Sequence, residues 1–85
     1  MKKLTILATE DVNKEGILDI LDKYLEGYTV LKAKGVWRGV PEDSLLIYIV
    51  DAEAKTIEII IHEIKETNNQ ESIMVLTTPC GVEFK

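Results

Sequence analysis

The chain has 85 residues, of which 46% are hydrophobic and 29% charged, and this length suits one domain over residues 1–85 rather than two. Fifteen Asp and Glu against ten Lys and Arg give a net charge of -5, which disfavours binding to nucleic acid through bulk electrostatics. One Cys and one His supply neither an internal disulfide nor a tetrahedral zinc site, so we expect no metal and no cofactor.

The N-terminal segment resembles a signal peptide only briefly. Lys2 and Lys3 precede an apolar run that ends at Glu10 and Asp11. That run is shorter than the roughly 7–15 residues of a signal-peptide core. The longest apolar run, residues 45–50, is far below the about 20 residues of a membrane span. We therefore expect a cytoplasmic protein that does not bind membranes.

The first half of the chain predicts strand, helix and strand. Residues 3–9 have the length and β-branched content of a strand. Residues 12–26 carry a helical apolar stripe, with Asp11 as the expected N-cap and Gly27 as the left-handed C-cap. Residues 28–36 alternate as a second strand, and residues 35–43 contain two glycines and a proline. This composition predicts a hairpin loop longer than the minimum.

The second half repeats the pattern. Residues 45–51 form an apolar strand, and the isoleucine-rich stripe over 54–67 is too long for a strand and predicts a helix that stops near Asn68 and Asn69. Residues 72–77 are the fourth strand, and after a turn at 78–81 the alternation of 82–84 allows a short fifth one. The order β-α-β-β-α-β predicts an α+β, ferredoxin-like fold, a four-stranded antiparallel sheet with both helices on one face.

Two of the strands are apolar on both faces, although two helices can cover only one. A sheet with one wet face should alternate apolar and polar residues, and residues 45–51 and 72–77 do not. The side chains assigned to the uncovered face are Leu7, Leu46, Tyr48, Val50, Met74 and Leu76. We therefore predict a homo-oligomer, the alternative being that the fifth strand or the loop folds across this face.

Basic residues are confined to one segment. Between Gly27 and Pro41 every charged residue is basic and the local charge is +3, so the rest of the chain, at -5 minus +3, carries -8. The cations are Lys32, Lys34 and Arg38. Trp37 beside Arg38, between two flexible glycines, suits a ligand that has a flat ring and a phosphate. The alternative is that Trp37 packs at the rim of the core or in a subunit contact while the lysines are solvated.

No residue is predicted to be catalytic. His62 falls on the polar side of its helix, and Cys80 has no evident base near it in the sequence. Glu42 and Asp43 are expected to cap the following strand or to pair with Arg38. The polar run 68–71 is either an ordinary helix stop or a set of ligand contacts.

The run from Tyr28 to Gly35, with the helix and strand order around it, resembles the PII-like superfamily of nitrogen-regulatory proteins and their CutA-type relatives. Segments 35–39, 42–44 and 69–73 also look like those of a group of small uncharacterised proteins. The superfamily resemblance implies a trimer that buries the helix-free sheet face and binds nucleotides or other small anions in clefts between subunits. Carried onto this chain, it implies that the cleft is lined by Lys32, Lys34, Gly35, Trp37, Arg38, Gly39, Asn69, Gln70, Thr78 and Cys80.

The leading functional hypothesis is a non-enzymatic homo-oligomer, with a trimer favoured, that binds an anionic, nucleotide-like small molecule between subunits. Binding would serve to sense the molecule or to sequester it, and the second role would suit a viral protein that removes a host immune signal. One alternative is a regulator that docks its Trp37-Arg38 loop into a protein partner, because Trp and Arg are enriched at binding hot spots. The other is a small enzyme on the same topology.

Overall fold

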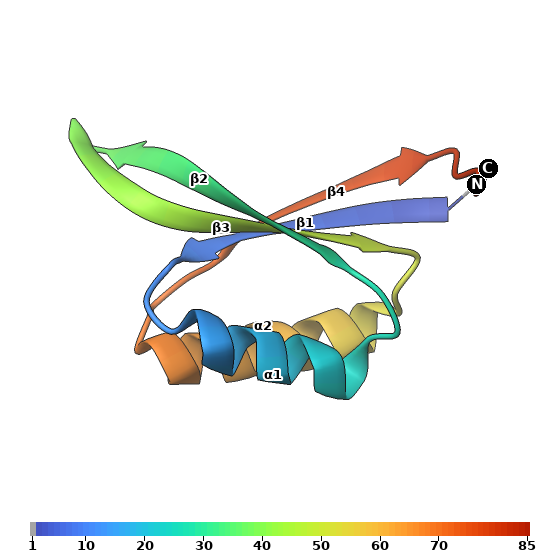
Figure 1. Ribbon diagram of the computed structural model, residues 1–85, viewed down its shortest axis with the longest axis horizontal. Helices are drawn as coiled ribbons and strands as arrows, with labels where there is room; N and C mark the ends of the chain where they lie inside the picture. The colour runs from blue at the N-terminus through green and yellow to red at the C-terminus, as the bar shows by residue number, and fades with distance from the viewer. Residues whose placement is uncertain (1) are drawn as a thin grey trace.

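The computed structural model describes residues 2–85 and has the predicted element order (Figure 1). The elements are β1 (Lys2–Glu10), α1 (Lys14–Tyr24), β2 (Thr29–Trp37), β3 (Val40–Val50), α2 (Ala54–Asn68) and β4 (Met74–Cys80). The four strands form one sheet in the order β2-β3-β1-β4, and every neighbouring pair is antiparallel. Both helices lie on the same face of the sheet (Figure 1), so the predicted ferredoxin-like fold is confirmed.

The core lies between the helices and one face of the sheet. The fully buried side chains come from α1, α2 and the two central strands, and they are Leu7, Ile17, Leu21, Leu45, Ile47, Ile49, Ile60 and Ile64. Successive strand residues point to opposite faces, so one parity of β1 and β3 faces the helices and the other faces away. Burying such side chains gives about 1.5–3 kcal/mol each, which holds the two layers together.

Leu7 is a correction to the sequence analysis, which assigned it to the helix-free face. Its side chain is 0% exposed and belongs to the core cluster. Thr5 and Thr9, on the same side of β1, are also buried. In the register of the sheet, the helix-free face of β1 instead carries Leu4 and Ile6.

The caps of α1 also differ from the prediction. The N-cap is Asn13, whose side-chain oxygen accepts a hydrogen bond from the Gly16 backbone N–H, and not Asp11. The helix ends at Tyr24, and Leu25 follows in an extended conformation, so Gly27 is not a left-handed C-cap. The left-handed cap in this fold is Asn69, at the end of α2, with φ 51° and ψ 49°.

The connection between β2 and β3 is a tight turn and not the predicted longer loop. The strands continue to Trp37 and from Val40, which are paired, and only Arg38 and Gly39 lie between them. Both turn residues have positive φ, 52° and 79°, as a two-residue type I′ hairpin turn requires. The segment 35–43 is therefore a rigid, paired hairpin.

The chain after α2 is also paired further than predicted. β4 runs through Thr78, Pro79 and Cys80, which the sequence analysis placed in a turn, and Cys80 lies opposite Lys2. Residues 81–85 form no strand, so the allowed fifth strand is absent from the described structure. This tail stands away from the molecule, and Phe84 is 93% exposed.

Candidate functional site

The helix-free face of the sheet carries a continuous apolar surface. Directly opposed residues on antiparallel strands share a face, so the register defines rows of side chains across all four strands. One row contains Tyr48, Ile6 and Leu76, and the next contains Leu31, Leu46, Ala8 and Met74. Leu4 and Val50 extend the patch. Nothing in residues 2–85 covers it, and Leu76 and Met74 are 50% and 57% exposed.

The tip of the β2–β3 hairpin, residues 36–40, presents apolar and basic groups together. Val36, Trp37 and Val40 are each more than half exposed. The Arg38 guanidinium carbon lies 5.6 Å from the centre of the Trp37 ring, a cation–π arrangement. The ring is therefore held by its own neighbour and still offers a face to solvent.

The lysines of the hairpin are not equivalent. The Lys34 ammonium lies 2.5 Å from Asp43 Oδ1, across the strand pair, so Asp43 pairs with Lys34 and not with Arg38. This hydrogen bond and charge hold the pKa of Asp43 below its usual range. Lys32 and Arg38 have no ion pair among residues 2–85, so they are the cations of this segment that remain available to an anion.

The side chain of Gln70 is engaged in a polar network at the end of β1. Its Oε1 accepts hydrogen bonds from Thr9 Oγ1 and Asn68 Nδ2, and its Nε2 donates to the Ser72 carbonyl at 2.8 Å. Asn68, which is 6% exposed, also donates to Thr9 Oγ1 and to the Glu10 carbonyl. The network fixes the turn after α2 against the sheet, and within it Gln70 has a structural role while Asn69 remains exposed.

The ten predicted site residues fall into two groups at opposite ends of one sheet. β1 ends at Glu10, which pairs with Ser44, and at this end lie the hairpin and residues 69–70. Thr78 and Cys80 lie at the other end, opposite Leu4 and Lys2. The figure makes the separation visible, with the hairpin tip at the left and both termini at the right (Figure 1). A single copy therefore does not bring the two groups together.

The structure adds a groove that the sequence analysis did not find. It has a volume of about 1000 Å³ and lies at the end of the sheet where β3 leads into α2, with the C-terminal tail beside it. Its apolar lining includes Leu25, Tyr28, Leu31, Tyr48 and Val50, and its polar lining includes Lys2, Glu26, Asp51 and Glu53. These residues come from separate parts of the chain, so no local sequence motif predicts that they lie together.

Two groups on the groove wall are held by neighbouring charges. The Tyr28 hydroxyl donates a hydrogen bond to the Asp22 carboxylate, and this bond, with partial burial, raises the pKa of Tyr28 to about 12. Tyr28 therefore stays neutral at every ordinary pH and lines the groove as an aromatic side chain. On the same groove wall, the Lys2 ammonium lies 3.1 Å from Asp51 Oδ2.

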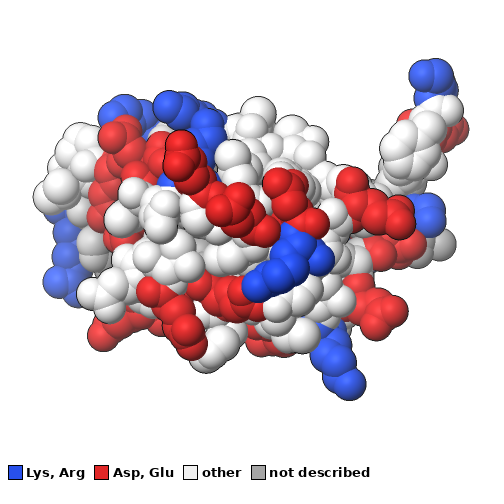
Figure 2. Space-filling model, turned by 60° about the horizontal axis from the view of Figure 1, so that its bottom comes forward, with Lys and Arg blue, Asp and Glu red and all other residues white. Residues whose placement is uncertain are grey.

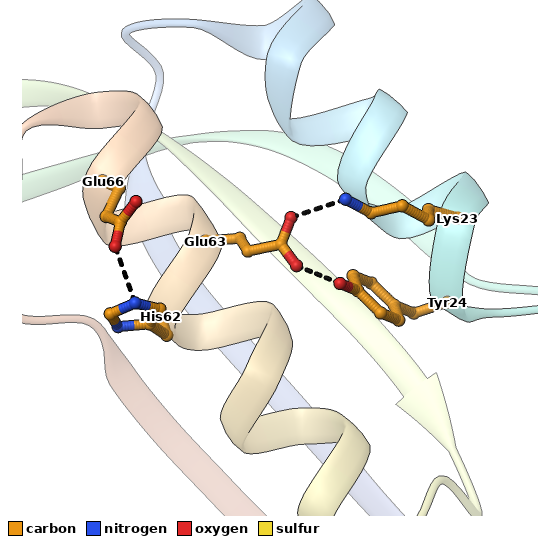
Figure 3. Close-up of polar contacts among 5 residues, drawn as sticks. All are labelled: Lys23, Tyr24, His62, Glu63 and Glu66. Carbon is orange, nitrogen blue, oxygen red and sulfur yellow. Dashed lines mark hydrogen bonds and ion pairs between the residues drawn. The ribbon is translucent and has the colours of Figure 1, made fainter.

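The only histidine, His62, lies in the helix layer, where it lines an open pocket together with Asn69 and Gln70, two of the predicted site residues. Figure 3 shows His62 beside Glu66, one turn along α2, with Nε2 2.6 Å from Oε1. In the same view Glu63 receives hydrogen bonds from Lys23, at 2.7 Å, and from Tyr24, which link the two helices. These bonds keep the pKa of Glu63 below its usual range. His62 is largely exposed, as the sequence predicts, and an exposed pair of this kind does not form an enclosed acid–base site.

Charge is distributed unevenly over the molecule. Figure 2 brings the helix layer forward, and acidic side chains predominate over it while a group of Lys and Arg side chains lies at the upper left. Among residues 2–85, no three His, Cys, Asp or Glu side chains gather as metal ligands would. None of the helices in that range is long and apolar enough to cross a membrane.

The fold is similar to that of PII-like proteins of known structure. A DUF3240 family protein from Shewanella baltica superposes with a TM-score of 0.73 at 15% identity, over 99% of this chain and 94% of that one. A nitrogen-regulatory PII-like protein from Thiomonas intermedia, bound to ADP, AMP and bicarbonate, has a TM-score of 0.66 at 22% identity, over 99% and 93%.

Two further structures share the fold. PII of Arabidopsis thaliana bound to citrate has a TM-score of 0.65 at 17% identity, over 93% of this chain and 77% of that one. A phage SAM lyase in complex with S-methyl-5′-thioadenosine has a TM-score of 0.64 at 17% identity, over 91% and 79%. In sequence, the chain matches no protein-family model and no curated protein. The structural likeness therefore establishes the fold, and the predicted PII-like resemblance is confirmed at that level.

Proposed function

We propose that this chain is a non-enzymatic homo-oligomer, a trimer by its PII-like resemblance, that binds an anionic, nucleotide-like small molecule between subunits. The observation that carries the proposal is the uncovered apolar face of the sheet, because large contiguous apolar patches on protein surfaces often mark interaction sites. Packing copies through that face buries it. Contact between copies is also what can unite the two groups of predicted site residues, since one copy keeps them at opposite ends.

The proposed ligand class rests on the cations of the hairpin and on the ligands found in solved structures of similar fold. Lys32 and Arg38 are free of ion pairs in residues 2–85, and Trp37 offers an exposed ring for stacking. The structures of similar shape hold citrate, ADP, AMP and bicarbonate, and S-methyl-5′-thioadenosine. Anions and adenosine-type rings recur among them. These observations support a role for this chain as a sensor of such a molecule or as a protein that sequesters it.

Calorimetry of the full chain against a panel of adenine and guanine nucleotides tests the proposal. We expect one or more to bind, and we expect Arg38→Ala to weaken that binding by about tenfold or more, because a hydrogen bond to a charged group contributes roughly 1.5–3 kcal/mol. Lys14→Ala, at the start of α1 and outside the candidate site, removes the same charge and is the control. A full panel without binding contradicts the proposal.

The ion pair between Lys34 and Asp43 gives a second, opposite prediction. Asp43→Asn should release Lys34 and strengthen binding of a nucleotide by about two- to fivefold, the value of one exposed charge interaction. Glu42→Gln makes the same change in net charge on the neighbouring residue without freeing Lys34, and we expect less effect. Calorimetry of the two variants side by side distinguishes them, and equal gains would contradict a specific role for Lys34.

The same ion pair predicts how acid affects the hairpin. The folded pKa of Asp43 lies below its unfolded value. The pair therefore supports the folded hairpin above the unfolded pKa and is lost as the pH falls through the folded pKa. The contribution is small because both side chains are largely exposed.

An enzyme is the second candidate, and one observation favours it: the phage SAM lyase shares this fold. Incubation with S-adenosylmethionine and mass spectrometry of the products tests it. Release of S-methyl-5′-thioadenosine at a rate above the uncatalysed one would replace the non-enzymatic proposal.

A further inference from the structure

The groove between the start of β1, the β3–α2 connection and the C-terminal tail combines apolar walls with a net negative charge. Its walls are apolar and aromatic, and three carboxylates, Glu26, Asp51 and Glu53, stand with one cation, Lys2. Lys2 is paired with Asp51, whereas Glu26 and Glu53 have no ion pair within residues 2–85. The groove therefore offers apolar contact area beside two uncompensated negative charges, which suits an apolar group that carries a positive charge.

The hairpin tip has the complementary chemistry. Val36, Trp37 and Val40 are 69%, 65% and 59% exposed, and Arg38 lies over the Trp37 ring. The two-residue turn is paired on both sides, so the tip is preorganised and loses little conformational freedom on binding. Tryptophan and arginine are both among the residue types enriched at binding hot spots.

The tip and the groove cannot meet within one chain. The tip extends beyond the last pair of β1 with β3, Glu10 with Ser44, and the groove includes Val50 and Lys2 at the opposite end. The molecule is 38 Å along its longest axis, which joins these ends in Figure 1. Different surfaces on two ends of one molecule give a head-to-tail contact, which closes into a ring when the rotation between copies allows it.

We propose that the Trp37-Arg38 tip of one copy inserts into the acidic-rimmed groove of the next copy. This inference rests on the oligomer of the proposed function, and it adds which two surfaces of neighbouring copies are in contact. The Trp37 ring contacts the apolar wall, and the Arg38 guanidinium lies near Glu26 and Glu53. Arg38 then supports ligand binding through the assembly, and Lys32 is the hairpin cation that faces the ligand. This contact brings the hairpin cations of one copy toward Thr78 and Cys80 of the next, since those residues share the groove end of the sheet.

Trp37 is the only tryptophan in the chain, so its fluorescence reports the contact directly. In the free chain the ring is 65% exposed and should emit as a solvated indole. In the assembled state we expect emission shifted to the blue, and on dilution a return to the red in step with the loss of mass seen by light scattering. Emission typical of solvated indole in a sample that is oligomeric by scattering would overturn the inference.

Charge reversal tests the partners of the contact. Arg38→Glu and Glu26→Lys should each weaken assembly by about 30-fold, the loss expected for a hot-spot residue, and remove the blue shift. The double variant, which exchanges the two charges, should regain both. Glu58→Lys, on the exposed side of α2, is the matched control. If Glu26→Lys is no worse than this control, or if the double variant regains nothing, the inference is wrong.

The outcome is distinguishable from failure of the proposed function. If the chain assembles and binds a nucleotide while Trp37 stays exposed, only the tip-to-groove contact fails. If the chain is a 9.6 kDa monomer at every concentration and binds no nucleotide, the proposed function fails as well.

Discussion

Leu76→Lys should prevent the proposed assembly and leave a monomer of 9.6 kDa. Leu76 lies on the edge strand β4, in the row with Ile6 and Tyr48 on the helix-free face. It is 50% exposed in one copy, so a lysine there reaches water in the monomer and costs folding stability little. Between copies the same ammonium would be buried without a partner, at a cost of several kcal/mol, which weakens association by about 100-fold or more.

Ile59→Lys is the matched control. Ile59 is an exposed apolar residue of similar size, 41% accessible, and it lies on α2 in the helix layer. The two variants add the same charge and remove comparable surface, so they differ only in the face that they alter. Sedimentation or light scattering of both should give a monomer for Leu76→Lys and the parental mass for Ile59→Lys. An unchanged mass for Leu76→Lys would remove the main support for the oligomer.

The fold was predictable because long elements carry strong periodicity. The stripe over Ile57, Ile60 and Ile64 fixes α2 and its buried side, and all three are buried. Two-sided apolar strands also predicted the uncovered face correctly in β3 and β4. The error at Leu7 has a physical reason: alternation shows which residues share a face and not which face the helices cover. Thr5 and Thr9 flank Leu7 on the same face of β1, and both lie under the helices.

The β2–β3 connection was predicted as a longer loop because of its glycines and proline, but Gly35 lies within β2 and Pro41 within β3. Pro41 lies in β3 beyond the last pair with β1, where β2 is its only neighbouring strand. At such a position a missing backbone N–H costs no ladder hydrogen bond when it points away from that neighbour. The turn itself is Arg38-Gly39, which lacks the Asn-Gly or Asp-Gly signature of two-residue turns. Composition alone could not separate a paired hairpin from a loop.

The candidate site was less accessible to sequence reasoning than the fold. Residue type identified the basic segment, but whether each cation is free depends on cross-strand register, which separates Lys34 from Lys32. The sequence predicted Gln70 as a ligand contact. In the structure its side-chain oxygen accepts hydrogen bonds from Thr9 and Glu10, which are 61 and 60 positions away in the chain. The groove assembles from residues scattered between Lys2 and Phe84, so only the folded chain reveals it.

The polar network at position 68 supports the last and sharpest stability prediction. Asn68 Nδ2 faces three acceptors, Thr9 Oγ1, the Glu10 carbonyl and Gln70 Oε1, at 3.0–3.1 Å. Asn68→Ala leaves these groups underpaired in a buried place and should lower the free energy of unfolding by about 1–3 kcal/mol. Asn68→Asp keeps the shape of the side chain but replaces the donating NH₂ group with a carboxylate oxygen that faces the same acceptors. The loss in free energy of unfolding at neutral pH should therefore exceed about 3 kcal/mol.

The two variants differ most clearly in their response to pH. Burial among acceptors raises the folded pKa of the carboxyl introduced by Asn68→Asp above its unfolded value. Its protonated form can donate one hydrogen bond, so the defect is smallest below the unfolded pKa and grows as the pH rises through the folded pKa. Urea unfolding at about pH 4 and about pH 7, at one protomer concentration, should give a widening deficit for Asn68→Asp and a constant one for Asn68→Ala. A constant deficit for both would mean that water reaches the end of α2, and the network would then not be what anchors the following turn to β1.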